Sequence, residues 1–198
     1  MNRLRPSAQV SSQDPDQSEP VGTHAPTRAA GLLLGVLRIV VGWTFLWAFV
    51  DKLFALGYAT GRDPDTGAVD RFGDAAWIHG GEPTYGFLAF GADGPFTDFY
   101  HSIAGDAWAD WLFMAGLLGI GLGLTLGVGM RLATVSGVVM YLLMWSVVLP
   151  PENNPITDEH TIGALVVAVL GLYAAGRYLG LGRWWERQPL VQRFPILK

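Results

Sequence analysis

Four apolar segments stand out along the chain, separated by stretches rich in polar residues. The first covers residues 29–50, the second begins near Trp111, the third covers residues 132–149, and the fourth covers residues 161–181. An apolar helix of about 20 residues is long enough to cross the ~30 Å hydrocarbon core of a bilayer. The pattern therefore predicts four membrane-spanning helices.

The second segment allows two secondary structures. Its stretch GIGLGLTLGVG alternates apolar residues with glycine, which is typical of a strand. Its glycines at 119, 123 and 127 also fall on one face of a helix, and membrane strands need only about 9–11 residues. We interpret the segment as a helix whose stripe of small residues lets a neighbour approach closely. That neighbour lies in the same bundle, or alternatively in a second copy of the chain.

Basic residues are distributed unevenly between the two sides of these segments. The long link over residues 51–106 holds nine acidic and three basic residues, and the link before the fourth segment has no Lys or Arg. The other side carries Arg28, Arg131 and the basic residues at the end of the chain. Because cytoplasmic loops are enriched in Lys and Arg, this distribution predicts a multi-pass protein of the cell membrane with both termini in the cytoplasm.

Composition supports the membrane interpretation and limits the chemistry. The chain is 51% hydrophobic and 15% charged, whereas soluble domains carry about 25% charged residues. A net charge of −4 without a basic stripe argues against nucleic acid as a partner. The chain has no cysteine, which excludes disulfides, a thiolate nucleophile and cysteine-ligated clusters.

The sequence divides into three parts. Residues 1–28 are polar and poor in large apolar residues, so we expect a disordered cytoplasmic tail. Residues 29–182 form the predicted four-helix membrane domain, and residues 183–198 form a basic cytoplasmic C-terminal segment. Aromatic residues are dense between positions 77 and 108. We expect that part of the long link to form short helices at the membrane interface.

Two cations lie within or beside the first segment. Arg38 lies about 12 Å inside it at 1.5 Å per residue, and we expect its side chain to reach back to the cytoplasmic head groups. Alternatively, Arg38 faces inward and holds an anionic or quinone head group. Lys52 follows Asp51 at the outer end. We expect an ion pair or a lipid phosphate contact there, with a ligand site beside the aromatic link as the alternative.

The polar stretch PPENNPITDEH precedes the fourth segment. Its prolines end the third segment, Asn153 and Asn154 suit a turn, and Thr157 or Asp158 can cap the next helix. A turn and a cap do not require His160 or a second asparagine, so these residues are candidates for ligand binding. The outer histidines His79, His101 and His160 match no known metal-ligand spacing, and we expect no metal site.

Several stretches together resemble the DoxX family. They are LRIVVGWTFLWAFVDKL, WIHGGEPTYGFLAFGADGPF, GLGLTLGVGMRLA and PPENNPITDEHTIGALVVAVLGLYAAGRYLGLGRWW, and the resemblance covers about residues 32–197. It implies an all-α four-helix membrane bundle, similar to the small membrane subunit of thiosulfate:quinone oxidoreductase. The positions nearest to family features are Lys52, Arg131, Asn153, Asn154, Asp158 and His160.

The resemblance implies a membrane subunit of a quinone-linked redox system, with thiosulfate or another sulfur donor and quinone as co-substrate. His160 or Asn154 could form a hydrogen bond with the quinone head group, and His160 could also accept a proton. The partners would then be lipid, another membrane or redox subunit, and a second copy of the chain. A non-catalytic scaffold that stabilises a partner enzyme is the alternative. A transporter is disfavoured because no paired broken helices appear.

Overall fold

The computed structural model describes residues 26–152 and 154–198. In these residues every regular element is a helix, and the only strand-like pairing is one isolated bridge between Arg62 and Val69. The predicted all-α class is confirmed. Most of the expected tail and one candidate site residue, Asn153, lie outside the described residues, and Arg28 already belongs to the first helix.

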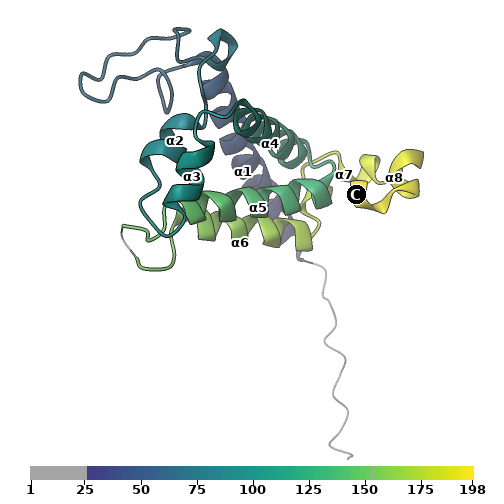
Figure 1. The fold of residues 1–198 in the computed structure, drawn as a ribbon. Helices are drawn as coiled ribbons and strands as arrows, with labels where there is room; N and C mark the ends of the chain where they lie inside the picture. The colour runs from purple at the N-terminus through teal and green to yellow at the C-terminus, as the bar shows by residue number, and fades with distance from the viewer. Residues whose placement is uncertain (1–25, 153) are drawn as a thin grey trace, which may run out of the picture.

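Four helices pack around a common apolar core (Figure 1). They are α1 (Arg28–Phe54), α4 (Ala107–Leu126), α5 (Met130–Val147) and α6 (Glu159–Leu172). Helix α1 packs along α4, α4 against α5, and α5 along α6, while α6 also touches α1. Fully buried side chains of α4 and α6, including Met114, Leu124 and Val167, fill the space between them.

Three of these helices, α1, α4 and α5, are long and apolar enough to cross a membrane. Their outer faces expose large apolar side chains such as Leu33, Trp111 and Val135, which are 70%, 66% and 63% exposed. Exposed apolar surface on this scale is unfavourable in water and acceptable against lipid tails. The first three predicted segments are therefore confirmed as membrane-compatible helices.

The predicted fourth span is too long. Helix α6 has 14 residues and ends at Leu172 instead of Leu181, so it is about 21 Å long. The chain then turns at Ala174, whose φ of 47° is left-handed, and forms the short helix η2 (Ala175–Arg177). Gly176 packs so closely on Gly127 that no side chain would fit between them. Leaving the helix also frees backbone carbonyls for a buried arginine, which is described below.

The long link forms the expected short helices: η1 (Trp77–His79), α2 (Tyr85–Phe90) and α3 (Thr97–Ile103). A second small core forms where α2 and α3 meet the end of α5, with Leu88, Tyr100 and Val147 buried in it. The Tyr100 hydroxyl also forms a hydrogen bond with the Ser146 hydroxyl of α5. Figure 1 shows α2 and α3 at one end of the four helices, with the remaining loop beside them.

The predicted glycine stripe is only partly a packing surface. Gly123 packs on Ala133 of α5, and Gly127 packs on Gly176. Gly119, however, is exposed and has open space where a side chain would begin. The close approach of α1 to α4 uses Gly121 instead, which lies against Leu46. The expectation of one continuous stripe is wrong because α1 and α5 contact different faces of α4.

The chain ends in three short helices at the end opposite α2 and α3 (Figure 1). They are α7 (Gly182–Trp185), α8 (Pro189–Arg193) and η3 (Pro195–Leu197). Arg131, at the start of α5, holds them in place. Its backbone N–H donates to the carbonyl of Lys198 at 2.7 Å, and its Nη1 donates to the carbonyl of Pro195 at 2.8 Å.

Candidate functional site

Arg38 faces the interior and is fully buried. Its guanidinium donates to the carbonyls of Leu124 and Thr125 in the last turn of α4, and to those of Tyr178 and Leu179 after η2. The last four carbonyls of a helix have no partner within the helix, so Arg38 acts as a C-terminal cap of α4. The expectation that Arg38 reaches the head groups is wrong, because these buried carbonyls bind its side chain more favourably than a surface would.

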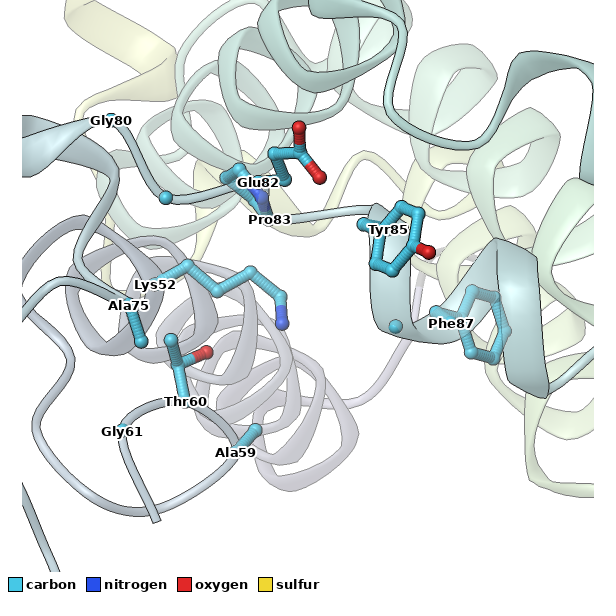
Figure 2. Close-up of a pocket in the computed structure, with 12 residues that line it drawn as sticks. Lys52, Ala59, Thr60, Gly61, Ala75, Gly80, Glu82, Pro83, Tyr85 and Phe87 are labelled. Carbon is cyan, nitrogen blue, oxygen red and sulfur yellow. The ribbon is translucent and has the colours of Figure 1, made fainter. Parts of the chain in front are cut away.

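A cavity of about 760 Å³ opens beside the last turn of α1. Its lining residues are Lys52, Ala59, Thr60, Gly61, Ala75, Gly80, Gly81, Glu82, Pro83, Tyr85, Gly86 and Phe87. Figure 2 shows the Lys52 side chain extended into the opening, with Thr60 on one side and Tyr85 on the other. We call this cavity the Lys52 pocket.

One wall of the Lys52 pocket is held by a buried carboxylate of α1. Asp51 is 1% exposed, and its carboxylate accepts the backbone N–H groups of Tyr58 at 3.2 Å and Ala59 at 2.9 Å. The Tyr58 ring also lies edge-on to Trp47, with 5.0 Å between centroids. These contacts fix the loop that carries Ala59 and Thr60 to the end of α1.

The opposite wall is held by a buried carboxylate of α4. Asp110 is 4% exposed, and one of its oxygens accepts both the backbone N–H of Thr84 at 2.9 Å and the Thr84 hydroxyl at 2.7 Å. Thr84 lies between Pro83 and Tyr85, which line the pocket. The two walls are therefore attached to α1 and α4, the pair of helices that pack along each other.

Within the described residues, Lys52 has no ion pair and its side chain has no hydrogen-bond partner. The ion pair that was one of the expectations for Lys52 does not form with the adjacent Asp51, because the Asp51 carboxylate is turned toward the backbone of Tyr58 and Ala59. The carboxylate of Glu82, across the pocket, points away from the ammonium group (Figure 2). A lysine donates up to three hydrogen bonds, so this cation is available to a ligand.

The loop between α5 and α6 behaves as a helix start. The Asn154 carboxamide oxygen accepts the backbone N–H groups of Ile156 and Thr157. Asp158 caps α6 by accepting the N–H groups of His160 and Thr161, and the Thr161 hydroxyl completes a capping box. The predicted cap at Asp158 is confirmed. The second carboxylate oxygen of Asp158 lies 2.6 Å from Nδ1 of His160. This contact fixes the imidazole ring at the first turn of α6.

The cap at Asp158 leads to a testable expectation. Burial alone would raise the pKa of Asp158, but hydrogen bonds from the His160 ring and from the backbone of Thr161 outweigh it and lower that pKa. The ionised cap therefore stabilises the fold fully above the unfolded pKa of about 3.9, and this stabilisation is lost as pH falls through the lower folded pKa. We expect Asp158→Ala to cost about 1 kcal/mol near neutral pH, and thermal unfolding measured across acidic pH checks this.

Asp158→Asn is the matched control, because asparagine caps a helix without a charge. Its melting temperature should lie between those of Asp158→Ala and the parent near neutral pH. At a pH below the pKa of Asp158 in the folded protein, the melting temperatures of Asp158→Asn and the parent should become equal. A constant difference at every pH would contradict the role of the ionised carboxylate.

The structure does not bring all of the predicted site residues together. Lys52 lines the pocket, whereas Asn154, Asp158 and His160 are absent from its lining. Arg38 and Arg131 bind backbone carbonyls at the opposite end of the helices. Asp110 and Thr84 are not among the site residues predicted from the sequence. An acid in the first turn of an otherwise apolar helix is the signal that could have identified Asp110.

Comparison of the chain with protein-family models, with curated proteins and with solved structures found no match.

Proposed function

We propose that the chain is an integral membrane protein that crosses the bilayer with α1, α4, α5 and α6. The apolar exposed faces of three long helices support this proposal. Helix α6 is short, and a short hydrophobic stretch is accommodated by local thinning of the bilayer. The excess of basic residues at the end that carries Arg131 then orients both chain termini toward the cytoplasm.

Within this frame we propose a DoxX-like subunit of a quinone-linked redox system, with the Lys52 pocket as the site of the quinone head group. The observation that carries the proposal is the unpartnered ammonium group of Lys52 in a cavity of about 760 Å³. A quinone head group needs few hydrogen-bond partners in a largely apolar slot. Lys52 supplies a donor, and the rings of Tyr85 and Phe87 supply apolar surface.

The chemistry of the pocket suits a carbonyl oxygen that gains electrons. The Lys52 ammonium would donate a hydrogen bond to a quinone oxygen, and the positive charge would favour the electron-rich reduced form. The electrons would come from a donor such as thiosulfate through a partner subunit. The chain would thus position the acceptor at the outer end of the bundle. An accessory scaffold without a quinone remains the competing function.

The test is quinone binding to the purified protein in lipid nanodiscs, titrated with a short-chain ubiquinone analogue. A hydrogen bond from a charged donor contributes about 1.5–3 kcal/mol, so Lys52→Met should weaken binding roughly 10- to 150-fold. Lys52→Arg, which keeps the charge, should retain most of the affinity. Arg183→Met removes an exposed cation that has no hydrogen bond within the described residues and does not line the pocket, and it should leave binding unchanged.

The His160→Ala variant tests whether the quinone head group binds in the Lys52 pocket or at the start of α6. Because His160 does not line the Lys52 pocket, its loss should not affect the titration. Weaker binding in His160→Ala alone would move the quinone to the start of α6. Full binding in both variants, or no binding by the parent protein, would overturn the proposed quinone site and favour the scaffold.

A further inference from the structure

The last part of the chain forms an ordered surface on the end of the bundle that carries Arg131. We call residues 182–197 the C-terminal platform. Val191 is fully buried beneath it, and the Trp185 ring N–H donates to the carbonyl of Leu197. Together with the two hydrogen bonds from Arg131, these contacts give the platform a fixed orientation relative to α5.

The C-terminal platform exposes large apolar side chains. Trp184, Leu190, Phe194 and Ile196 are 56%, 58%, 48% and 63% exposed. Three of these side chains lie on helices of four, five and three residues, and Phe194 lies between the last two of these helices, so no helix of the platform can cross a bilayer. Exposed aromatic and aliphatic side chains on a short, fixed element indicate a surface that meets another phase or another molecule.

Cations are interleaved with these apolar side chains. Arg183, Arg187 and Arg193 are exposed, and in the described part of the chain none lies within ion-pair distance of an acid. The platform's single acid, Glu186, is already held by Arg177 through a bond of 2.9 Å. The surface is therefore both positively charged and apolar, whereas the long link at the opposite end is rich in acids.

We propose that the C-terminal platform binds the anionic phospholipid head groups of the membrane that the chain crosses. Tryptophan and phenylalanine favour the interfacial layer, and arginine beside such a layer is attracted to anionic lipid. The platform packs on η2 and on the start of α5, level with the helix ends where head groups meet the protein. The inference rests on membrane insertion as proposed above and is independent of quinone binding.

The test uses the absence of cysteine from the chain. Gln192→Cys places a single exposed thiol on the platform for an environment-sensitive fluorophore. The full chain is placed in nanodiscs of phosphatidylcholine alone or of phosphatidylcholine mixed with phosphatidylglycerol. We expect a blue-shifted emission in the anionic nanodiscs, and loss of that shift when salt is added.

Arg183→Gln, Arg187→Gln and Arg193→Gln combined should remove the phosphatidylglycerol-dependent shift. The same three positions changed to lysine keep the charge and should retain it. Both variants change exposed side chains and should elute like the parent on size exclusion. Identical emission of the parent in both lipids, or a glutamine variant that behaves like the parent, would overturn the proposal.

Discussion

Arg38→Met is expected to destabilise the protein more than any other single substitution described in this article. The change leaves four carbonyls, at the end of α4 and after η2, without the donor that binds them. A buried acceptor that loses its donor costs about 1–3 kcal/mol, and this substitution affects four acceptors at once. Methionine fills a similar volume, so the loss reflects hydrogen bonding more than a cavity. The melting temperature of the purified protein, followed by size-exclusion chromatography after heating, measures the effect.

Arg38→Lys provides the graded control for this prediction. Lysine keeps the charge but donates from a single nitrogen, so it cannot reach both pairs of carbonyls with the geometry of the guanidinium fork. Its melting temperature should lie between those of the parent and Arg38→Met. Arg183→Met, which removes an exposed cation without a hydrogen bond in the described part of the chain, should leave stability unchanged. Equal melting temperatures for the parent and Arg38→Met would show that the four carbonyls do not need this cap.

Asp110→Ala is expected to have the second-largest effect, because it affects both stability and the Lys52 pocket. The substitution removes the acceptor for the backbone N–H and the hydroxyl of Thr84. Two hydrogen bonds to a buried carboxylate, at about 1.5–3 kcal/mol each, together contribute about 3–6 kcal/mol. The segment that carries Pro83 and Tyr85 should then loosen. Limited proteolysis of that segment should become faster, and the melting temperature should fall.

A double-mutant cycle with Thr84→Val identifies the cause. Valine removes the hydroxyl but keeps the backbone N–H, so Thr84→Val alone should cost less than Asp110→Ala. When Asp110 is already replaced by alanine, Thr84→Val should lower the stability only slightly further. Asp98→Ala, at an exposed acid of the neighbouring helix α3, is the matched control and should be neutral. Additive effects of the two changes would contradict a direct contact between Asp110 and Thr84.

The first three helices could be predicted from hydrophobic length alone, because each apolar run is bounded by polar or turn-forming residues. The fourth run has no such boundary after Leu172. Its end is decided by contacts distant in the sequence, namely Gly176 on Gly127 and the carbonyls of Tyr178 and Leu179 on Arg38. Periodicity reports local structure, and it cannot reveal a helix that ends to satisfy a remote side chain.

In the candidate site, too, only contacts between residues close in the sequence could be predicted. Asp158 could be identified as a helix cap because its partners are two and three residues away. The surroundings of Lys52 could not be predicted from the sequence. They depend on a hydrogen bond between Thr84 and Asp110, which are 26 residues apart. The sequence led us to expect an ion pair or a lipid phosphate contact for Lys52, and Asp51 is its nearest acid in the sequence. Consecutive helical residues point in different directions, and the backbone of Tyr58 and Ala59 binds the carboxylate instead.

The attachment of the two pocket walls has a mechanical consequence. One wall is held by hydrogen bonds to Asp51 of α1, and the other is held by hydrogen bonds to Asp110 of α4. Between these helices, Gly42 meets the backbone of Thr125 and Gly121 meets Leu46, with no room for an added carbon atom. Such tight meshing prevents α1 from sliding along α4, so the width of the entrance is set by a rigid frame.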